Sequence, residues 1–162
     1  MGALASLKPV ASTMKAVRVW TYLCVVLVLA ACRIGPGEDI SSEKPYADLI
    51  GVRYSVVADN LIAHGVYESL DNRVLSYIEL VPIRLGGAEY AFRRKVQKGQ
   101  VVRILSARRQ FIPLQNGVYY LVAVENSDLP QGLPIRLALF RGNEGEGADL
   151  NPAMYRRLPK GN

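Results

Sequence analysis

Two neighbouring stretches of sequence decide the fold: KGQVVRIL at residues 98–105 and NGVYYLVAV at residues 116–124. Each begins with a turn pair, Lys-Gly or Asn-Gly, and continues as a run rich in Val, Ile, Leu and Tyr. Turn pairs followed by β-branched and aromatic residues are typical of strands entered from tight turns. The two stretches therefore predict a β-hairpin in the second half of the chain.

Short runs of the same kind continue on both sides of this hairpin, separated by turn sequences such as Asp-Asn, Gly-Gly and Pro-Gln-Gly. No segment keeps a helical period over three turns, although residues 45–50 or 152–158 have room for a short helix. Both faces of several runs are apolar, as expected where a sheet closes or folds upon itself. The sequence predicts an all-β domain, a small antiparallel barrel or sandwich, with strands at residues 51–57, 61–67, 74–81, 101–107, 118–124 and 135–140.

The predicted hairpin also resembles the central hairpin of bacterial SH3-type domains, in which a Lys-Gly turn feeds one strand and a Gly-aromatic pair starts the next. This resemblance implies an SH3-like β domain. The Leu-Asn-Val-Arg element at the start of that family is missing from this chain, so the family's wall-binding role does not carry over.

The beginning of the chain has the organisation of an export signal. Residues 19–31 form an uncharged run that follows Lys15 and Arg18 and ends in Leu29-Ala30-Ala31-Cys32. Positive charges, a short apolar helix and small residues in this order direct a protein to export. The run has 13 residues, whereas a helix that spans a bilayer needs about 20. We therefore expect a signal helix rather than a permanent membrane span.

Residues 29–32 match the lipobox of bacterial lipoprotein precursors, and the whole segment resembles their signal peptides. The resemblance implies cleavage between Ala31 and Cys32. It also implies a diacylglycerol on the Cys32 thiol and an N-linked acyl chain, such as palmitate, on the freed amine. An ordinary secretory signal with a chance cysteine and a transmembrane anchor are the alternatives.

Two details refine this prediction. Met14 is the expected true start, because MKAVRVW begins a compact signal and residues 1–13 add nothing recognisable. Arg33 follows the cysteine in place of the Asp that retains such lipoproteins in the inner membrane. The resemblance therefore implies the inner leaflet of the outer membrane, with the protein facing the periplasm.

The chain is thus expected to have three parts: a signal peptide at residues 1–31, a lipidated cysteine with a flexible tether at residues 32–46, and a single β domain at residues 47–160. The tether is predicted from its Gly, Pro and Ser content and its lack of apolar periodicity.

Cleavage lowers the formal net charge from +6 to +3, because residues 1–31 contain three of the 20 basic residues and none of the 14 acidic ones. Much of the basic character is therefore lost with the signal, and we expect no nucleic-acid partner.

Few residues of the mature chain are suited to catalysis or metal binding. Cys24 leaves with the signal and Cys32 is expected to be acylated, so no thiol remains for a disulfide or a nucleophile. His64 is the one histidine, no Gly-x-Ser-x-Gly nucleophile motif accompanies it, and zinc needs several His or Cys ligands. The acidic loop at residues 142–149 lacks the EF-hand order of calcium ligands and is predicted to be solvated. We therefore predict a protein that is not an enzyme, with no metal and no cofactor apart from the lipid.

Basic residues cluster at both ends of the strand predicted at residues 101–107. The ends of such a strand lie about 20–30 Å apart. Basic and tyrosine side chains are common at surfaces that bind acidic partners. The candidate binding surface comprises Arg93, Arg94, Lys98, Arg108, Arg109 and Tyr119. Its expected partner is an envelope protein, an anionic lipid or a glycan.

The sequence therefore predicts a lipid-anchored cell-envelope protein whose non-catalytic β domain is a binding or structural module. A periplasmic inhibitor or accessory protein of an envelope enzyme is the first alternative. A hydrolase that uses His64 is the second.

Overall fold

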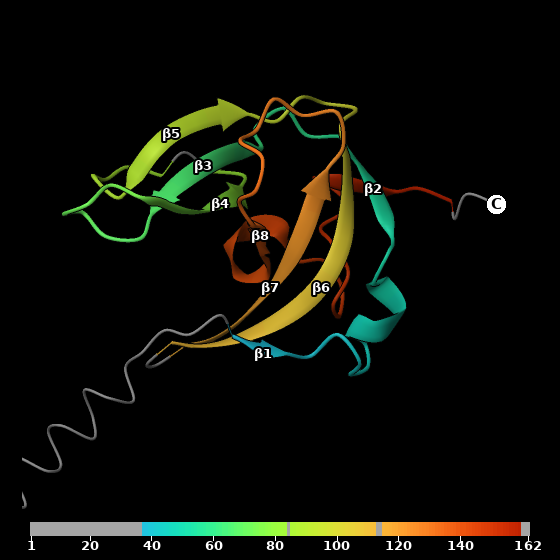
Figure 1. The fold of residues 1–162 in the computed structure, drawn as a ribbon. Helices are drawn as coiled ribbons and strands as arrows, with labels where there is room; N and C mark the ends of the chain where they lie inside the picture. Colours follow the sequence, from blue (N-terminus) through green and yellow to red (C-terminus); the bar gives the residue numbers. More distant parts are fainter. Residues whose placement is uncertain (1–36, 84, 113–114, 160–162) are drawn as a thin grey trace, which may run out of the picture. The chain divides into compact units, whose positions relative to one another are not determined.

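The computed structural model describes residues 37–83, 85–112 and 115–159. Its elements are mainly strands (Figure 1). In chain order they are β1 (Glu38–Asp39), a 3₁₀ helix (Tyr46–Leu49), β2 (Arg53–Val56), β3 (Ile62–Tyr67), β4 (Leu75–Val81), β5 (Tyr90–Lys95), β6 (Val101–Ile112), β7 (Gln115–Val124), β8 (Ile135–Ala138), a π-helical turn (Leu139–Asn143) and β9 (Tyr155–Arg157).

In the described part of the chain the nine strands form one mixed sheet, in the order β5-β3-β4-β8-β7-β6-β2-β9, with β1 paired to β6. The prediction of an all-β domain is confirmed. The sheet differs from the predicted antiparallel barrel in two ways: β4 and β8 are parallel, and the end strands β5 and β9 are not paired with each other in the described residues. β8 pairs with β7 in antiparallel orientation along one edge and with β4 in parallel orientation along its other edge.

The strands of both halves of the sheet share one core. Ala63 of β3 and Leu80 of β4 belong to the same buried cluster as Ile104 of β6 and Tyr120 of β7. The sheet therefore bends around a common interior. The other face of β3 is covered too, since His64 and Val66 are buried as well, and this explains why β3 reads as apolar on both faces.

The predicted strands are all present with shifted bounds, and the hairpin of β6 and β7 is longer than predicted. Residues 45–50, one of the two segments with room for a short helix, contain the 3₁₀ helix Tyr46–Leu49. Residues 152–158 contain β9 instead of a helix. The sequence did not predict β1, β5 or β9.

The flexible tether predicted at residues 32–46 is wrong over its described part, and the β domain begins before residue 47. The compact unit starts at Pro36, and residues 38–39 pair with β6 as β1. The side chain of Ile40 is fully buried in the core. A single apolar side chain among polar neighbours has no periodicity, which is why the sequence reads as a linker.

The other predictions for the beginning of the chain cannot be compared with the structure. The signal peptide, the start at Met14, the cleavage site at Ala31 and the lipidated Cys32 lie outside the described residues. Among the residues that the structure does describe, no helix has the length and apolarity needed to cross a membrane.

Candidate functional site

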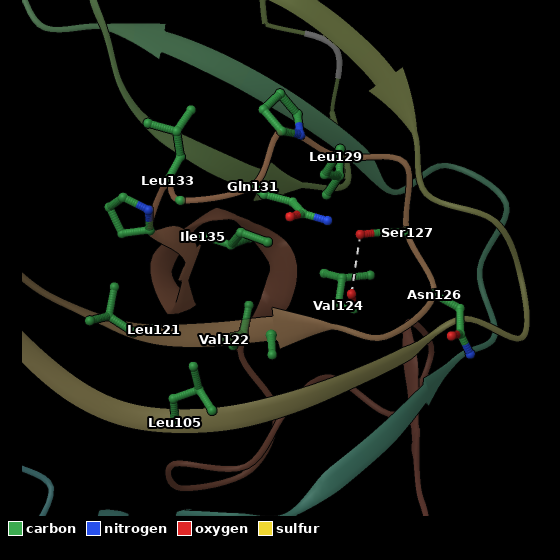
Figure 2. Close-up of a pocket in the computed structure, with 14 residues that line it drawn as sticks. Leu105, Leu121, Val122, Val124, Asn126, Ser127, Leu129, Gln131, Leu133 and Ile135 are labelled. Carbon is green, nitrogen blue, oxygen red and sulfur yellow. Dashed lines mark hydrogen bonds between the residues drawn. The ribbon is translucent and has the colours of Figure 1, made fainter.

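An apolar groove of about 670 Å³ lies between the end of β7 and the connection from β7 to β8 (Figure 2). Leu105 of β6 and Leu121 of β7 lie along one side, with Leu129 and Leu133 of the connection on the other. The lining residues are Leu105, Leu121, Val122, Ala123, Val124, Asn126, Ser127, Leu129, Pro130, Gln131, Gly132, Leu133, Pro134 and Ile135.

The connection that forms the outer wall of the groove is fixed at its beginning. Asn126 has a positive φ of 53°, which turns the chain sharply at the end of β7. The Ser127 hydroxyl then donates a hydrogen bond of 3.1 Å to the carbonyl oxygen of Val124, drawn as a dashed line in Figure 2. The side chain of Leu129 is buried in the main core. The first half of the wall is therefore attached to the domain.

The same connection is held by two neighbouring strands. The guanidinium of Arg94, on β5, donates a bond of 2.6 Å to the carbonyl oxygen of Asp128. At the other end, the backbone N–H of Ile78, on β4, donates a bond of 2.9 Å to the carbonyl oxygen of Pro134. These bonds keep the wall in place, so the groove is formed before any ligand arrives.

The chemistry of the groove suits binding rather than reaction. Of the described residues that line it, none has an acidic, basic or thiol side chain, so the wall offers no general acid or base. Leu105 is 48% exposed although it is apolar. The polar side chains are the hydroxyl of Ser127 and the amides of Asn126 and Gln131, and each amide both donates and accepts hydrogen bonds.

The basic surface predicted from the sequence is divided between distant parts of the domain. Arg93 and Arg94 lie on β5, and Lys98 is exposed in the turn before β6. Arg93 donates a bond of 2.6 Å to the carbonyl oxygen of Leu85 and lies over the ring of Tyr90. Figure 1 shows β5 at the top of the domain and β1, which pairs with the other arginines, at the bottom.

Arg108 and Arg109 are neutralised by the segment that was predicted to be a tether. The guanidinium of Arg108 lies 3.1 Å from the carboxylate of Asp39. Arg109 pairs with Glu38 at 3.3 Å and Glu43 at 2.7 Å. The hydrogen bond that Arg109 donates to Glu43 raises the pKa of Arg109 above its ordinary value. These two arginines therefore bind acids of their own chain.

Tyr119 was predicted to lie on the binding surface, and the structure does not place it there. It is only 4% exposed and belongs to a packed cluster. The guanidinium of Arg136 lies 5.0 Å from the centre of its ring and 3.9 Å from that of Tyr77. One cation thus lies against two tyrosine rings, an arrangement that stabilises a partly buried charge.

A buried carboxylate lies next to this cluster. Glu79 of β4 is opposite Arg136 of β8 in the parallel register and accepts a bond of 3.2 Å from Arg141. Burial raises the pKa of Glu79, and the charges of Arg141 and Arg136 oppose that rise. Sequence reasoning missed this cluster, although polar residues within apolar strands were a visible signal for it.

His64 is fully buried between β4 and β5. Its Nε2 lies 3.2 Å from the carbonyl oxygen of Ile83, and its ring lies edge-on to Tyr90 with centres 5.1 Å apart. A catalytic histidine has to reach a nucleophile and a substrate. The contacts of His64 hold the connection after β4 instead.

The acidic loop at residues 142–149 is packed against the domain at Asn143, which is fully buried, and again over its second half. Ala148 and Leu150 are buried, and the carboxylate of Asp149 accepts hydrogen bonds from the hydroxyl of Tyr54 and the backbone N–H of Leu150. The prediction of a solvated loop is therefore wrong for these residues. No cluster of three or more His, Cys, Asp or Glu side chains suited to a metal ion occurs in the described ranges.

Compared with known proteins, the chain matches no protein-family model, no curated protein and no solved structure. The resemblance of residues 29–32 to lipoprotein precursors, and that of the β6–β7 hairpin to SH3-type domains, therefore stay predictions.

Proposed function

We propose that this chain is a lipid-anchored protein of the bacterial cell envelope whose β domain is a non-catalytic binding module. Cys32 carries the lipid, and the protein faces the periplasm from the inner leaflet of the outer membrane. The export signal and lipobox support the location. The observation that carries the binding role is the preformed, largely aliphatic groove between β7 and the β7–β8 connection.

The lining of the groove favours an apolar segment of a partner protein over a lipid or a glycan. An anionic lipid needs a cation for its head group, and none lines the groove among the described residues. A glycan needs many hydrogen-bonding side chains, whereas most of the lining is aliphatic. The amides of Asn126 and Gln131 match the neutral donors and acceptors of a peptide backbone. A role as an accessory protein of an envelope enzyme is consistent with such a partner.

The partner can be tested by photo-crosslinking in the envelope of the native host. A photoreactive residue in place of Leu133, in the groove wall, is expected to crosslink to an apolar segment of one polypeptide. The same residue in place of Leu70, which is 59% exposed on the β3–β4 connection, is the matched control and should give no such product. Leu105→Glu should weaken the Leu133 crosslink, because a partner bound in the groove would have to bury the introduced carboxylate. Position 105 is half exposed in the free domain, so the charge is not buried by folding.

Equal crosslinking from positions 133 and 70, or a product unaffected by Leu105→Glu, would contradict the role of the groove.

The lipid anchor has its own test, the intact mass of protein extracted from envelope membranes. We expect a chain that begins at Cys32 and carries a diacylglyceryl group. An unmodified chain that retains residues 14–31 would exclude the anchor.

A hydrolase that uses His64 is not favoured by any contact of that residue. His64→Ala should leave crosslinking at position 133 unchanged in protein that remains folded. Loss of a hydrolytic activity in that variant would revive the alternative.

A further inference from the structure

The sheet ends at β5, and one edge of this strand is open. Within the described ranges, β5 pairs with β3 alone. Figure 1 shows it along the upper margin of the sheet. Arg93, Arg94 and Lys95, in the second half of the strand, are exposed. An open edge presents backbone N–H and C=O groups to which another strand can bind.

The hydrogen bonds between β3 and β5 show which backbone groups this edge offers. The backbone N–H of Val96, just after β5, donates a bond of 2.9 Å to the carbonyl oxygen of Leu61, just before β3. In an antiparallel pair, residues that bond to the neighbouring strand alternate with residues whose N–H and C=O point away from it. The backbone of Arg94 therefore faces β3. The N–H and C=O groups of Arg93 and Lys95 point outward, where an added strand would meet them.

The side chains of the same two residues place positive charge along the edge, on one face of the sheet. The Nε of Arg93 donates a bond of 2.6 Å to the carbonyl oxygen of Leu85. A guanidinium has further N–H groups, which can donate to a carboxylate while this bond stays in place. The amine of Lys95 lies 3.9 Å from the carboxylate of Asp59, and both side chains are exposed. An ion pair of this kind contributes little, so a carboxylate of a partner can replace Asp59.

A hollow of about 490 Å³ lies beside these two cations. Arg93 and Lys95 line it from the edge strand, and Ile62 lines it from β3. A long acidic side chain of an added strand can therefore enter the hollow between the two cations. When a strand is added to a sheet, the backbone bonds supply affinity and such pockets supply specificity. The lining residues are Asp59, Asn60, Ile62, Pro82, Arg93 and Lys95.

The charge of the edge argues against a second copy of this chain as the added strand. Two antiparallel β5 strands that pair about Arg94 would place Arg93 of each copy opposite Lys95 of the other. Like charges directly opposite each other destabilise a pair of strands. Charges on an edge strand thus prevent association between copies, and the same charges favour a strand of opposite sign.

We propose that the outer edge of β5 binds an extended acidic segment of a partner protein, which adds a strand to the sheet. Its backbone bonds to the outward N–H and C=O groups of Arg93 and Lys95, and its carboxylates face the side chains of these two residues. An anionic lipid head group would meet the charges of the edge but would leave its backbone groups without partners. The inference depends neither on the apolar groove nor on the lipid anchor, because it uses a different surface.

A synthetic peptide of alternating Glu and Val tests this edge. The labelled peptide is titrated with the full chain in detergent solution, and fluorescence anisotropy measures binding. We expect binding of the Glu–Val peptide and none of a Lys–Val peptide of the same length. Arg93→Glu combined with Lys95→Glu should weaken the Glu–Val peptide about tenfold and should allow the Lys–Val peptide to bind, because each reversed charge exchanges attraction for repulsion.

Two further variants make this comparison specific to β5. Lys95→Glu alone should weaken the Glu–Val peptide in the same direction, and it replaces the double variant if that folds poorly. Arg156→Glu reverses an exposed charge on β9, at the other end of the sheet. It is the matched control and should leave binding unchanged. No binding of the Glu–Val peptide, or an equal loss in Arg156→Glu and Lys95→Glu, would overturn the proposal.

N-methylation of the peptide separates an added strand from simple attraction between charges. One peptide is methylated on its Glu nitrogens and a second on its Val nitrogens. Only one edge of an added strand donates to β5, so one of the two peptides should lose binding and the other should retain it. Equal binding of the two methylated peptides would overturn strand addition and would indicate a general surface for anions, such as lipid head groups.

Discussion

Ile40 and Ala107 join the N-terminal segment to the sheet. The backbone N–H of Ile40 donates a hydrogen bond of 3.0 Å to the carbonyl oxygen of Ala107, and the backbone N–H of Ala107 donates one of 2.9 Å to the hydroxyl of Ser41. The side chain of Ile40 is fully buried. A segment with the composition of a linker is thus part of the hydrogen-bonded sheet and of the core.

Ile40→Ala should lower the free energy of unfolding by about 2–5 kcal/mol, the usual loss when a large buried aliphatic side chain is truncated. Urea denaturation measures this change. Lys44→Ala, at an exposed position of the same segment, is the control and should have little effect. A loss for Ile40→Ala as small as that of the control would mean that residues 37–45 form a tether after all.

Gly65→Ala should destabilise the domain by about 1–3 kcal/mol through overpacking. Phe92 of β5 lies opposite Gly65 of β3, and a Cβ at Gly65 would overlap with the Phe92 ring. The ring thus covers the glycine and shields its backbone. Gly86→Ala is the matched control, because Gly86 has no positive φ and nothing lies within 4 Å of an added Cβ.

Thermal unfolding of these two glycine variants gives the comparison. We expect a clear decrease in Tm for Gly65→Ala and almost none for Gly86→Ala. Equal Tm values would show that the Phe92 ring moves aside at no cost.

Asn143→Ala should lower the free energy of unfolding by about 3 kcal/mol, because several buried polar groups lose their partner. The Asn143 amide nitrogen donates to the carbonyl oxygens of Leu80 and Ala138, each at 3.0 Å. Its amide oxygen accepts from the hydroxyl of Tyr155 at 2.8 Å. Denaturant unfolding measures the loss.

Two further variants separate the hydrogen bonds of Asn143. Tyr155→Phe removes one bond and should cost about 1 kcal/mol. Asn143→Asp should cost more than Asn143→Ala, because it places a carboxylate against two carbonyl oxygens. An Asn143→Asp variant as stable as the wild type would contradict the assigned direction of these bonds.

Glu79→Gln should leave the protein at least as stable as the wild type at pH 7. Burial raises the pKa of Glu79 above its ordinary value of 4.5. At pH values between the ordinary and the raised pKa, the folded state therefore holds a proton that the unfolded state has released. Stability of the wild type therefore increases as the pH falls through the raised pKa, and the gain is complete near pH 4.5. The difference in unfolding free energy between Glu79→Gln and the wild type should therefore become smaller over the same pH range.

Urea unfolding of both proteins at pH values between 7 and 4.5 measures how this difference in unfolding free energy changes. Glu68→Gln removes an exposed carboxylate and controls for the change in net charge. A Glu79→Gln variant that is less stable at pH 7, with a deficit that narrows on acidification, would mean that pairing with Arg141 outweighs the cost of burial.

Local sequence was enough to predict six of the nine described strands, because each of the six depends on turn residues and on runs of β-branched and aromatic side chains. It missed β5, whose sequence YAFRRK has three adjacent charges. Such charges are tolerated on an edge strand, where one side of the backbone is unpaired. The sequence therefore indicated a basic surface where the structure has a sheet edge.

The candidate site depended on contacts that are distant in the sequence. Nothing near Arg108 and Arg109 shows that Glu38, Asp39 and Glu43 will pair with them. The groove wall at residues 126–134 was predicted only as a turn. Its leucines, set between prolines and a glycine, were the one signal that this turn has an apolar side.

The parallel pairing of β4 with β8 also determines how the domain is assembled. Hairpins such as β3–β4 and β6–β7 close short loops, whereas Ile78 meets Ile135 only after all the intervening chain has been synthesised and folded back. Long loops cost more entropy to close, so we expect the hairpins to form early and this pair to form late. Until then the open edges of β4 and β8 can pair with other chains. A newly synthesised molecule would therefore be most vulnerable to aggregation before these two strands meet.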